Sequence, residues 1–155
     1  QLFAKQKLKF YYGDLTERQF RNIFKKASNI KGDTSQILIE LLERRLDATV
    51  YRMKFVPTIF SARQLVNHGH VKVNGKRVNI PSYSVSDGDE ISIRDKSKEI
   101  NLIVESVSSQ EREIPEYLEV DVKELKGRFL RAPLIHDVPY PVTMEPNLVI
   151  EYYSR

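Results

Sequence analysis

Apolar residues recur at three- and four-residue steps through most of the first 70 positions, which is the spacing of amphipathic helices. Thr16 and Gln19 have the form of a capping box, and Thr58 is placed to cap a further helix. Gly13 and Gly69 are placed to end the helices that precede them. This pattern predicts four helices, over 2–12, 16–27, 33–53 and 58–69.

Beyond position 70 the apolar residues alternate with polar ones, as in half-buried strands. Valines at 71, 73 and 78 flank Asn74-Gly75, the strongest short signal for a hairpin. Further strands are predicted over 90–94, 117–120, 127–131 and 148–152, with a polar helix over 98–110. The chain is therefore expected to be an α+β protein, one body with two lobes.

The composition excludes several classes of protein. The chain has 155 residues, is 41% hydrophobic and contains no cysteine, so it can bury a core without disulfides, and a zinc ribbon or a thiol nucleophile is ruled out. Its apolar runs are too short to cross a bilayer, and no membrane association is expected.

Charge is distributed unevenly along the chain. Residues 1–80 hold 16 Lys and Arg against 6 Asp and Glu, a net +10, while residues 81–155 hold 9 against 15, a net −6. A basic half suits a polyanionic partner, because each neutralised phosphate releases condensed counterions.

The polar positions of 58–69 and of the hairpin form the main candidate site. Amides, imidazoles and guanidinium groups can contact the sugars and phosphates of folded RNA, whose helices are recognised largely by shape. The predicted contacts of this basic corner are Arg63, Gln64, Asn67, His68, His70, Lys72, Asn74, Lys76 and Arg77.

The earlier helices add a second set of basic residues. These are Lys5, Lys7 and Lys9 in the first helix, Arg18, Arg21 and Lys25 in the second, and Arg45 and Arg52 in the third. A solvated basic stripe is the competing interpretation of the second helix.

Signals for catalysis or for a metal are weak. His68-Gly69-His70 lacks a third ligand at a suitable spacing, and Asp87-Gly88-Asp89 is typical of a turn. Arg45-Leu46-Asp47 resembles the catalytic stretch of pseudouridine synthases, but here it falls within a predicted helix, so Asp47 is interpreted as a solvated aspartate. No catalytic residue, metal or cofactor is predicted.

An ordered set of motifs nevertheless resembles one family, the bacterial-type small-subunit ribosomal protein four. The motifs are 17–21 (ERQFR), 41–47 (LLERRLD), 50–53 (VYRM), 62–66 (ARQLV), 73–75 (VNG), 78–83 (VNIPSY) and 151–155 (EYYSR). The resemblance implies an α-L RNA-binding module, two helices packed on a small antiparallel sheet, over 45–108. It is inserted into a helical and C-terminal lobe of 1–44 and 109–155.

The resemblance also implies a function. Members of the family bind small-subunit ribosomal RNA at a multi-helix junction and nucleate assembly of the small subunit in the cytoplasm. They neighbour small-subunit ribosomal protein five, and some repress the mRNA of their own operon. A monomer is expected outside the ribosome. The family usually has a further basic N-terminal segment, which this sequence lacks.

Two alternatives stay open at this point. The α-L module also occurs as the RNA-recognition part of RNA-modifying enzymes such as pseudouridine synthases, and a basic face can bind an acidic protein. In addition, Ile59-Phe60 stands where many family members place an arginine, so one RNA contact is expected to be missing.

Overall fold

A computed structural model describes residues 1–154; Arg155, the last residue of the family-like ending, lies outside them. The chain forms two compact units, residues 1–43 with 133–155 and residues 44–132. Unit 1 contains α1 (Leu2–Tyr11), α2 (Glu17–Asn29), α3 (Thr34–Glu43), the 3-10 helix η2 (Ile135–Asp137) and α7 (Pro146–Tyr153). Unit 2 contains α4 (Leu46–Arg52), α5 (Ile59–Asn67), β1 (Val71–Val73), β2 (Lys76–Arg77), β3 (Glu90–Ile93), the 3-10 helix η1 (Asp95–Ser97), α6 (Asn101–Ser108), β4 (Leu118–Asp121) and β5 (Lys126–Phe129).

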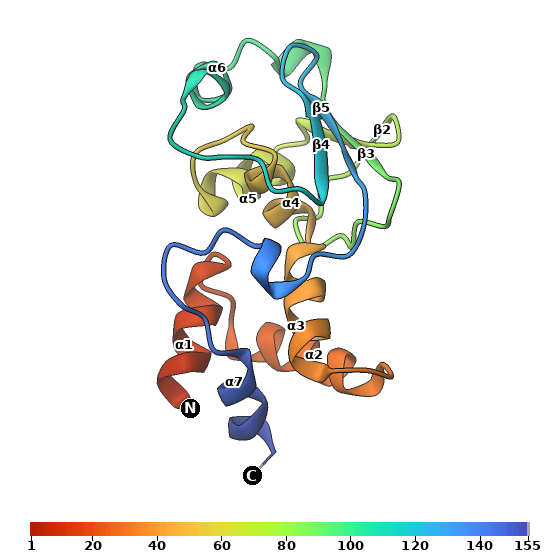
Figure 1. The fold of residues 1–155 in the computed structure, drawn as a ribbon. Helices are drawn as coiled ribbons and strands as arrows, with labels where there is room; N and C mark the ends of the chain where they lie inside the picture. Colours follow the sequence, from red (N-terminus) through yellow and green to blue (C-terminus); the bar gives the residue numbers. More distant parts are fainter. Residues whose placement is uncertain (155) are drawn as a thin grey trace. The chain divides into compact units, whose positions relative to one another are not determined.

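Unit 1 is built on the apolar stripes of its helices. The predicted capping box opens α2, where Thr16 Oγ1 accepts a hydrogen bond from the Gln19 amide at 3.1 Å and Gln19 Oε1 accepts one from the Thr16 amide at 2.9 Å. Helix α1 packs beside α7, and α3 packs on both α2 and α7 (Figure 1). Leu8, Leu38 and Val149 are buried where these helices meet.

Unit 2 is an antiparallel five-stranded sheet in the order β2-β1-β3-β5-β4, with α4 packed on α5. Cross-strand partners share a face of such a sheet. Val73, Ile91 and Gly127 are paired across three strands and are buried, whereas Lys72, Ser92 and Lys126 form the neighbouring row on the other face. The α+β class expected from the sequence is confirmed.

The long third helix predicted from the sequence is two helices. Arg45 leaves helical geometry at φ −59° and ψ 140°, and forms an antiparallel bridge with Ser84. The first amides of α4 then donate outward, Leu46 to the Tyr83 carbonyl and Asp47 to the Pro81 carbonyl. The apolar spacing continues through this break, so periodicity alone could not reveal it.

The last predicted strand, 148–152, is wrong, because the residues form helix α7. Pro146 occupies the first turn, where its missing amide hydrogen costs nothing. The segment is rich in β-branched and aromatic residues, which favours a strand locally, but packing against α1 and α3 overrides that preference.

The C-terminal boundary of the sheet unit also differs from the predicted 108, because 109–132 belong to unit 2. Strand β5 pairs with β3, with Ile91 opposite Gly127. The segment before β4 is fastened to the same unit by Arg112, which donates to the carbonyls of Tyr51 and Val56.

Candidate nucleic-acid interface

Helix α5 presents one polar face to solvent. The second capping box opens it, with the Ser61 amide donating to Thr58 Oγ1 at 3.0 Å. Ile59, Ala62, Leu65 and Val66 are buried, which leaves Gln64, Asn67 and His68 exposed and Arg63 half-buried on the opposite side. The predicted grouping of these four polar side chains is confirmed.

The hairpin is joined directly to the exit of α5. Arg77 Nε donates to the Gly69 carbonyl at 3.0 Å, and the Val78 amide donates to the Val71 carbonyl at 3.1 Å. The rings of His68 and His70 lie 6.3 Å apart. We call the exposed and half-exposed polar side chains of α5 and of one face of β1–β2 the α5–hairpin surface: Arg63, Gln64, Asn67, His68, His70, Lys72 and Arg77. Lys76, a predicted contact, pairs with Val73 and therefore lies on the other face of the sheet, so it is not included.

His70 is held in a cationic environment. Its Nδ1 lies 2.6 Å from Ser97 Oγ, and desolvation lowers the pKa of the imidazole, with smaller contributions from Arg94, His68 and Arg77. Repulsion from these neighbours disfavours the charged ring in the protein alone. A phosphate at this position would have the opposite effect, because an anion favours the imidazolium.

Asn74 has a structural role at the turn. Asn74 and Gly75 have φ values of 50° and 82°, which fits the type I′ turn that Asn-Gly favours. The side chain of Asn74 donates to Asp89 Oδ1 and accepts from the Glu90 amide, both at 2.9 Å. It is therefore not included in the α5–hairpin surface, although it was a predicted contact.

Asp87 and Asp89 form hydrogen bonds at the turn that the sequence indicated. Asp87 accepts from Arg44 at 2.7 Å, and Asp89 accepts from the Ser86 amide at 2.9 Å. Within residues 1–154, no group of three or more His, Asp or Glu side chains is placed to hold a metal ion.

Asp47 is buried, which corrects the interpretation of a solvated aspartate. Its carboxylate accepts from Arg45 Nε at 3.1 Å and Arg45 Nη2 at 3.0 Å, and Arg63 Nε lies 3.6 Å from Oδ2. Leaving helix geometry at Arg45 turns residues 45–47 inward, whereas a continuous helix would have placed Asp47 outward. The carboxylate lies behind the α5–hairpin surface.

Three predicted RNA-binding residues are buried, so they are not included in a contact surface. Lys5 donates to both carboxylate oxygens of Glu17 at 2.9 Å and lies 4.5 Å from the centre of the Tyr152 ring. Arg45 is paired with Asp47, and Arg52 packs beside the ring of Tyr51. The ion pair with Lys5 lowers the pKa of Glu17.

The two other lysines of α1 are also engaged within unit 1. Lys7 donates to the Thr143 carbonyl at 2.7 Å, and Lys9 lies 3.5 Å from Glu17. By contrast, the outer face of α2 exposes Arg18, Arg21 and Lys25, at successive turns. Among the predicted residues that the structure describes in unit 1, those on this basic face of α2 are exposed, whereas Lys5, Lys7 and Lys9 are buried or half-buried.

Two further cationic residues, Lys126 and Arg94, lie near the α5–hairpin surface and were not predicted from the sequence. The register places Lys126 opposite Ser92, which lies opposite Lys72, so two exposed or half-exposed lysines share one row of the sheet. The Arg94 amide donates to the His70 carbonyl at 2.9 Å. The pairing of β3 with β5 is non-local, and alternation within one strand carries no information about it.

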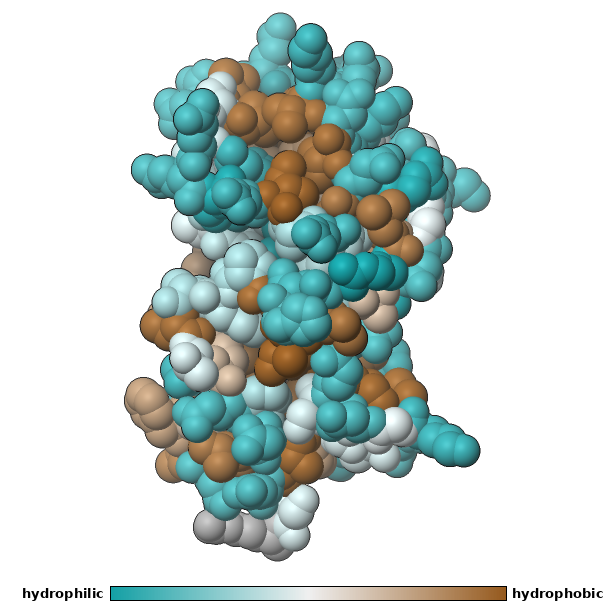
Figure 2. All heavy atoms as spheres, in the orientation of Figure 1, coloured by the Kyte–Doolittle hydropathy of each residue, from teal (hydrophilic) through white to brown (hydrophobic). Residues whose placement is uncertain are grey.

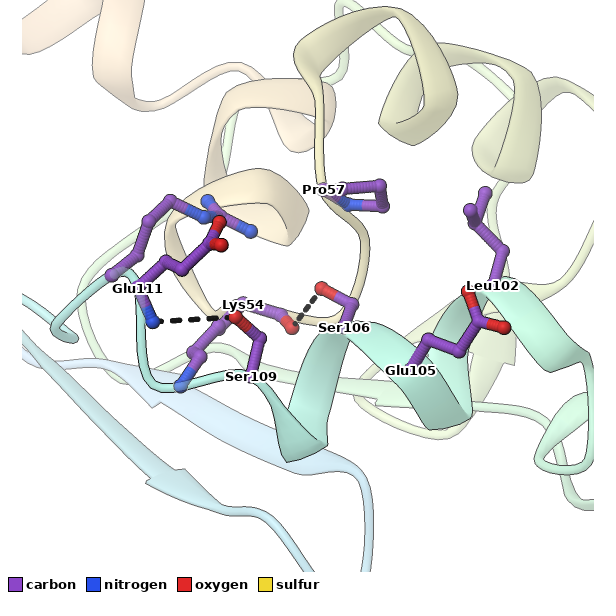
Figure 3. A pocket seen from close by; sticks show the side chains of 8 residues that line it. Lys54, Pro57, Leu102, Glu105, Ser106, Ser109 and Glu111 are labelled. Atoms are coloured by element: carbon purple, nitrogen blue, oxygen red, sulfur yellow. Dashed lines mark hydrogen bonds between the residues drawn. The ribbon is translucent and has the colours of Figure 1, made fainter.

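A cavity of about 270 Å³ lies elsewhere in unit 2, between α6 and the segment after α4 (Figure 3). Ser106 Oγ donates to the Lys54 carbonyl at 2.8 Å, and the Glu111 amide donates to Ser109 Oγ at 3.2 Å. The lining serine hydroxyls have no histidine beside them, and they hold the backbone together. We therefore assign this cavity no catalytic role.

The surface in view varies in polarity. Figure 2 shows hydrophobic side chains gathered in unit 2 between α6 and the β4–β5 hairpin, with hydrophilic side chains around them. Among the residues described, no helix combines the length and the hydropathy required to traverse a lipid bilayer.

Comparison with known proteins connects these features to a family. Residues 44–91 match the S4 domain, and residues 1–43 match the ribosomal protein S4/S9 N-terminal domain. The whole chain is 64% identical to small ribosomal subunit protein uS4 of Ruegeria sp. (strain TM1040), and 62% identical to that of Paracoccus denitrificans (strain Pd 1222), in each case covering 75% of the relative. The uS4 proteins are not enzymes, which confirms the absence of enzymatic activity expected from the sequence. The chain belongs to the uS4 family of ribosomal proteins.

Proposed function

We propose that this chain is a structural component of the small ribosomal subunit and binds small-subunit ribosomal RNA through the α5–hairpin surface. The observation that carries the proposal is the gathering of that surface. The polar face of α5 and the hairpin are fixed to one another by the Arg77 to Gly69 hydrogen bond, and their polar side chains are exposed or half-exposed. Family membership supports the assignment, and with it a location in cytoplasmic ribosomes.

The chemistry of the surface suits a folded RNA. Gln64, Asn67 and His68 offer donors and acceptors that can meet 2′-hydroxyl groups, while Lys72 and Arg77, which share a face of the hairpin, offer charge to phosphates. A helix locked against a hairpin presents these groups at fixed separations. Such a surface selects a backbone shape rather than a base sequence.

The basic face of α2 provides a second contact in the proposal. Arg18, Arg21 and Lys25 project from one side of the helix, opposite buried Phe20 and Ala27. Two surfaces on two units can bind separate arms of one RNA junction, which would bring those arms together. This is how the chain would nucleate subunit assembly.

The finer partnerships are also part of the proposal. By resemblance to the family, protein five of the small subunit is the expected protein neighbour, and the operon mRNA of the chain is a further candidate ligand. Neither requires a cofactor.

A salt titration tests the proposed surface. Lys72→Ala should weaken binding to the ribosomal RNA junction and reduce the slope of log affinity against log salt by about 1. Lys123→Ala, which removes the same charge from an exposed position before β5, is the matched control. Equal slopes for the Lys72→Ala and Lys123→Ala variants would count against this surface.

Footprinting tests the partner. Small-subunit ribosomal RNA should be protected by the chain at one multi-helix junction. Diffuse protection along the RNA, with the same affinity for an unrelated duplex, would reduce the proposal to non-specific electrostatic binding.

A further inference from the structure

We infer that Asp47 is a positioning residue for the α5–hairpin surface: its buried carboxylate, held from one side by Arg45, orients the guanidinium of Arg63 toward RNA. The inference rests on the proposed function, because the orientation of Arg63 matters only if that surface binds a ligand. It assigns a function to the Asp47 carboxylate, which is buried and cannot contact RNA directly.

The arrangement is a carboxylate between two arginines. Asp47 is 1% exposed, and Arg45 grips it in a bidentate pair with Nε at 3.1 Å and Nη2 at 3.0 Å. Arg63 Nε lies 3.6 Å from the Oδ2 atom of the same carboxylate. The side chain of Arg63 is 29% exposed, so it extends from this buried ion pair to the surface of α5.

Charge balance shows why one arginine would be enough for stability alone. A buried carboxylate requires a partner, and the bidentate pair with Arg45 already neutralises it. The contact with Arg63 is therefore not required to neutralise Asp47, and the placement of the Arg63 guanidinium is the role that it can serve.

Rigidity is the second part of the argument. A free arginine side chain loses about 2 kcal/mol of rotamer freedom when it is fixed. Because Asp47 restrains the Nε side of the guanidinium, part of that loss occurs on folding rather than on binding. A planar fork fixed in direction can also meet a phosphate through two hydrogen bonds, which a lysine cannot do.

The backbone supports this role of Asp47. The Asp47 amide donates to the Pro81 carbonyl at 3.1 Å, and its carboxylate accepts from the Ala48 amide at 2.7 Å. The carboxylate is thus fixed from several directions. It is also paired with guanidinium groups and buried, so it is not exposed as a catalytic carboxylate would be.

A double-mutant cycle on the intact chain tests the inference. Asp47→Asn, Arg63→Ala and the double variant are titrated with the ribosomal RNA junction. We expect Asp47→Asn to weaken binding by about tenfold, which corresponds to a coupling of ordinary size for residues in contact. The double variant should bind no more weakly than Arg63→Ala alone, because Asp47 acts through Arg63.

The outcomes separate the inference from the proposed function. If Arg63→Ala leaves RNA affinity unchanged, the proposed surface is wrong at this residue. If Arg63→Ala weakens binding but the two losses multiply in the double variant, Asp47 acts on the fold as a whole, and the inference is overturned.

A further variant leaves the buried pair of Asp47 and Arg45 in place. Arg63→Lys retains the charge but removes the fork, so it should bind nearly as weakly as Arg63→Ala at the same salt concentration. Affinity equal to that of the unmodified chain would overturn the inference even if Asp47→Asn does not fold. Far-ultraviolet circular dichroism and a urea titration verify the fold of each variant.

Discussion

Arg77 Nε donates a hydrogen bond to the Gly69 carbonyl across 3.0 Å, so the hairpin is fixed to the residue at which α5 ends. Gly69 adopts φ +80°, and a Cβ atom at this position would collide with the guanidinium of Arg77. Gly69 therefore allows both the reversal of the chain and the close approach of Arg77. The distance between α5 and the hairpin depends on the absence of a side chain at this position.

Gly69→Ala should destabilise the chain by about 2 kcal/mol or more, because the left-handed conformation is strained for alanine and Arg77 is displaced. Gly75→Ala is the matched control, since Gly75 has φ +82° but nothing within 4 Å of an added Cβ. Urea unfolding measures both. Equal losses of stability would show that the contact with Arg77 adds nothing beyond backbone strain.

Lys5→Met should reduce the free energy of unfolding without changing RNA affinity. The Lys5 side chain is 4% exposed and donates to Glu17. Loss of a hydrogen bond to a charged group costs about 1.5–3 kcal/mol. Lys26→Met, at an exposed position of α2, should change stability by about 0.5 kcal/mol or less. Weaker RNA binding by a folded Lys5→Met variant would restore Lys5 to the contact surface.

Gly127→Ala should be strongly destabilising, because an added Cβ would lie 2.8 Å from the Glu119 carbonyl oxygen and 2.9 Å from the Met53 side chain. Overpacking of this kind costs about 1–3 kcal/mol. Combining it with Met53→Ala relieves the contact with the flexible side chain, so the double variant should be more stable than additivity predicts. Chemical denaturation of the four proteins measures the coupling, and strict additivity would contradict the predicted collision.

The stability of the chain should depend on pH through His70. Burial lowers the pKa of the folded imidazole below its ordinary value of 6.5, so the unfolded chain binds a proton more readily than the folded chain. This contribution to stability is present above pH 6.5 and is lost as the pH falls below it. His70→Gln should have a smaller loss of stability between neutral pH and about pH 5.5. Parallel pH profiles of urea midpoints would contradict this assignment.

Local signals were sufficient for much of the fold. The Thr16–Gln19 capping box, the Thr58 cap, the Asn74-Gly75 turn and the polar face of α5 depend on residues within a few positions of each other, and the structure confirms them. The α5–hairpin surface was predictable for this reason. Its helix and its hairpin are consecutive in the chain, so no distant contact had to be inferred.

Non-local contacts account for the errors. The break at Arg45 depends on a bridge to Ser84, and the helical form of α7 depends on packing against α1, far away in sequence. The burial of Asp47 and of Lys5 has the same origin. A periodic pattern shows which side of an element is apolar, but it does not show which charged residues a distant segment will cover.

Unit 1 is formed by two stretches that lie far apart in the chain, and this affects the order in which the chain can fold during synthesis. Residues 1–43 lack α7 until 146–153 have been made, whereas unit 2 is complete once residue 132 has emerged. Because nascent domains fold in the order in which their segments become available, the second unit should mature first. Until then, helices α1–α3 would expose the apolar side of α1 that α7 later covers. We expect a chaperone to bind this segment during synthesis.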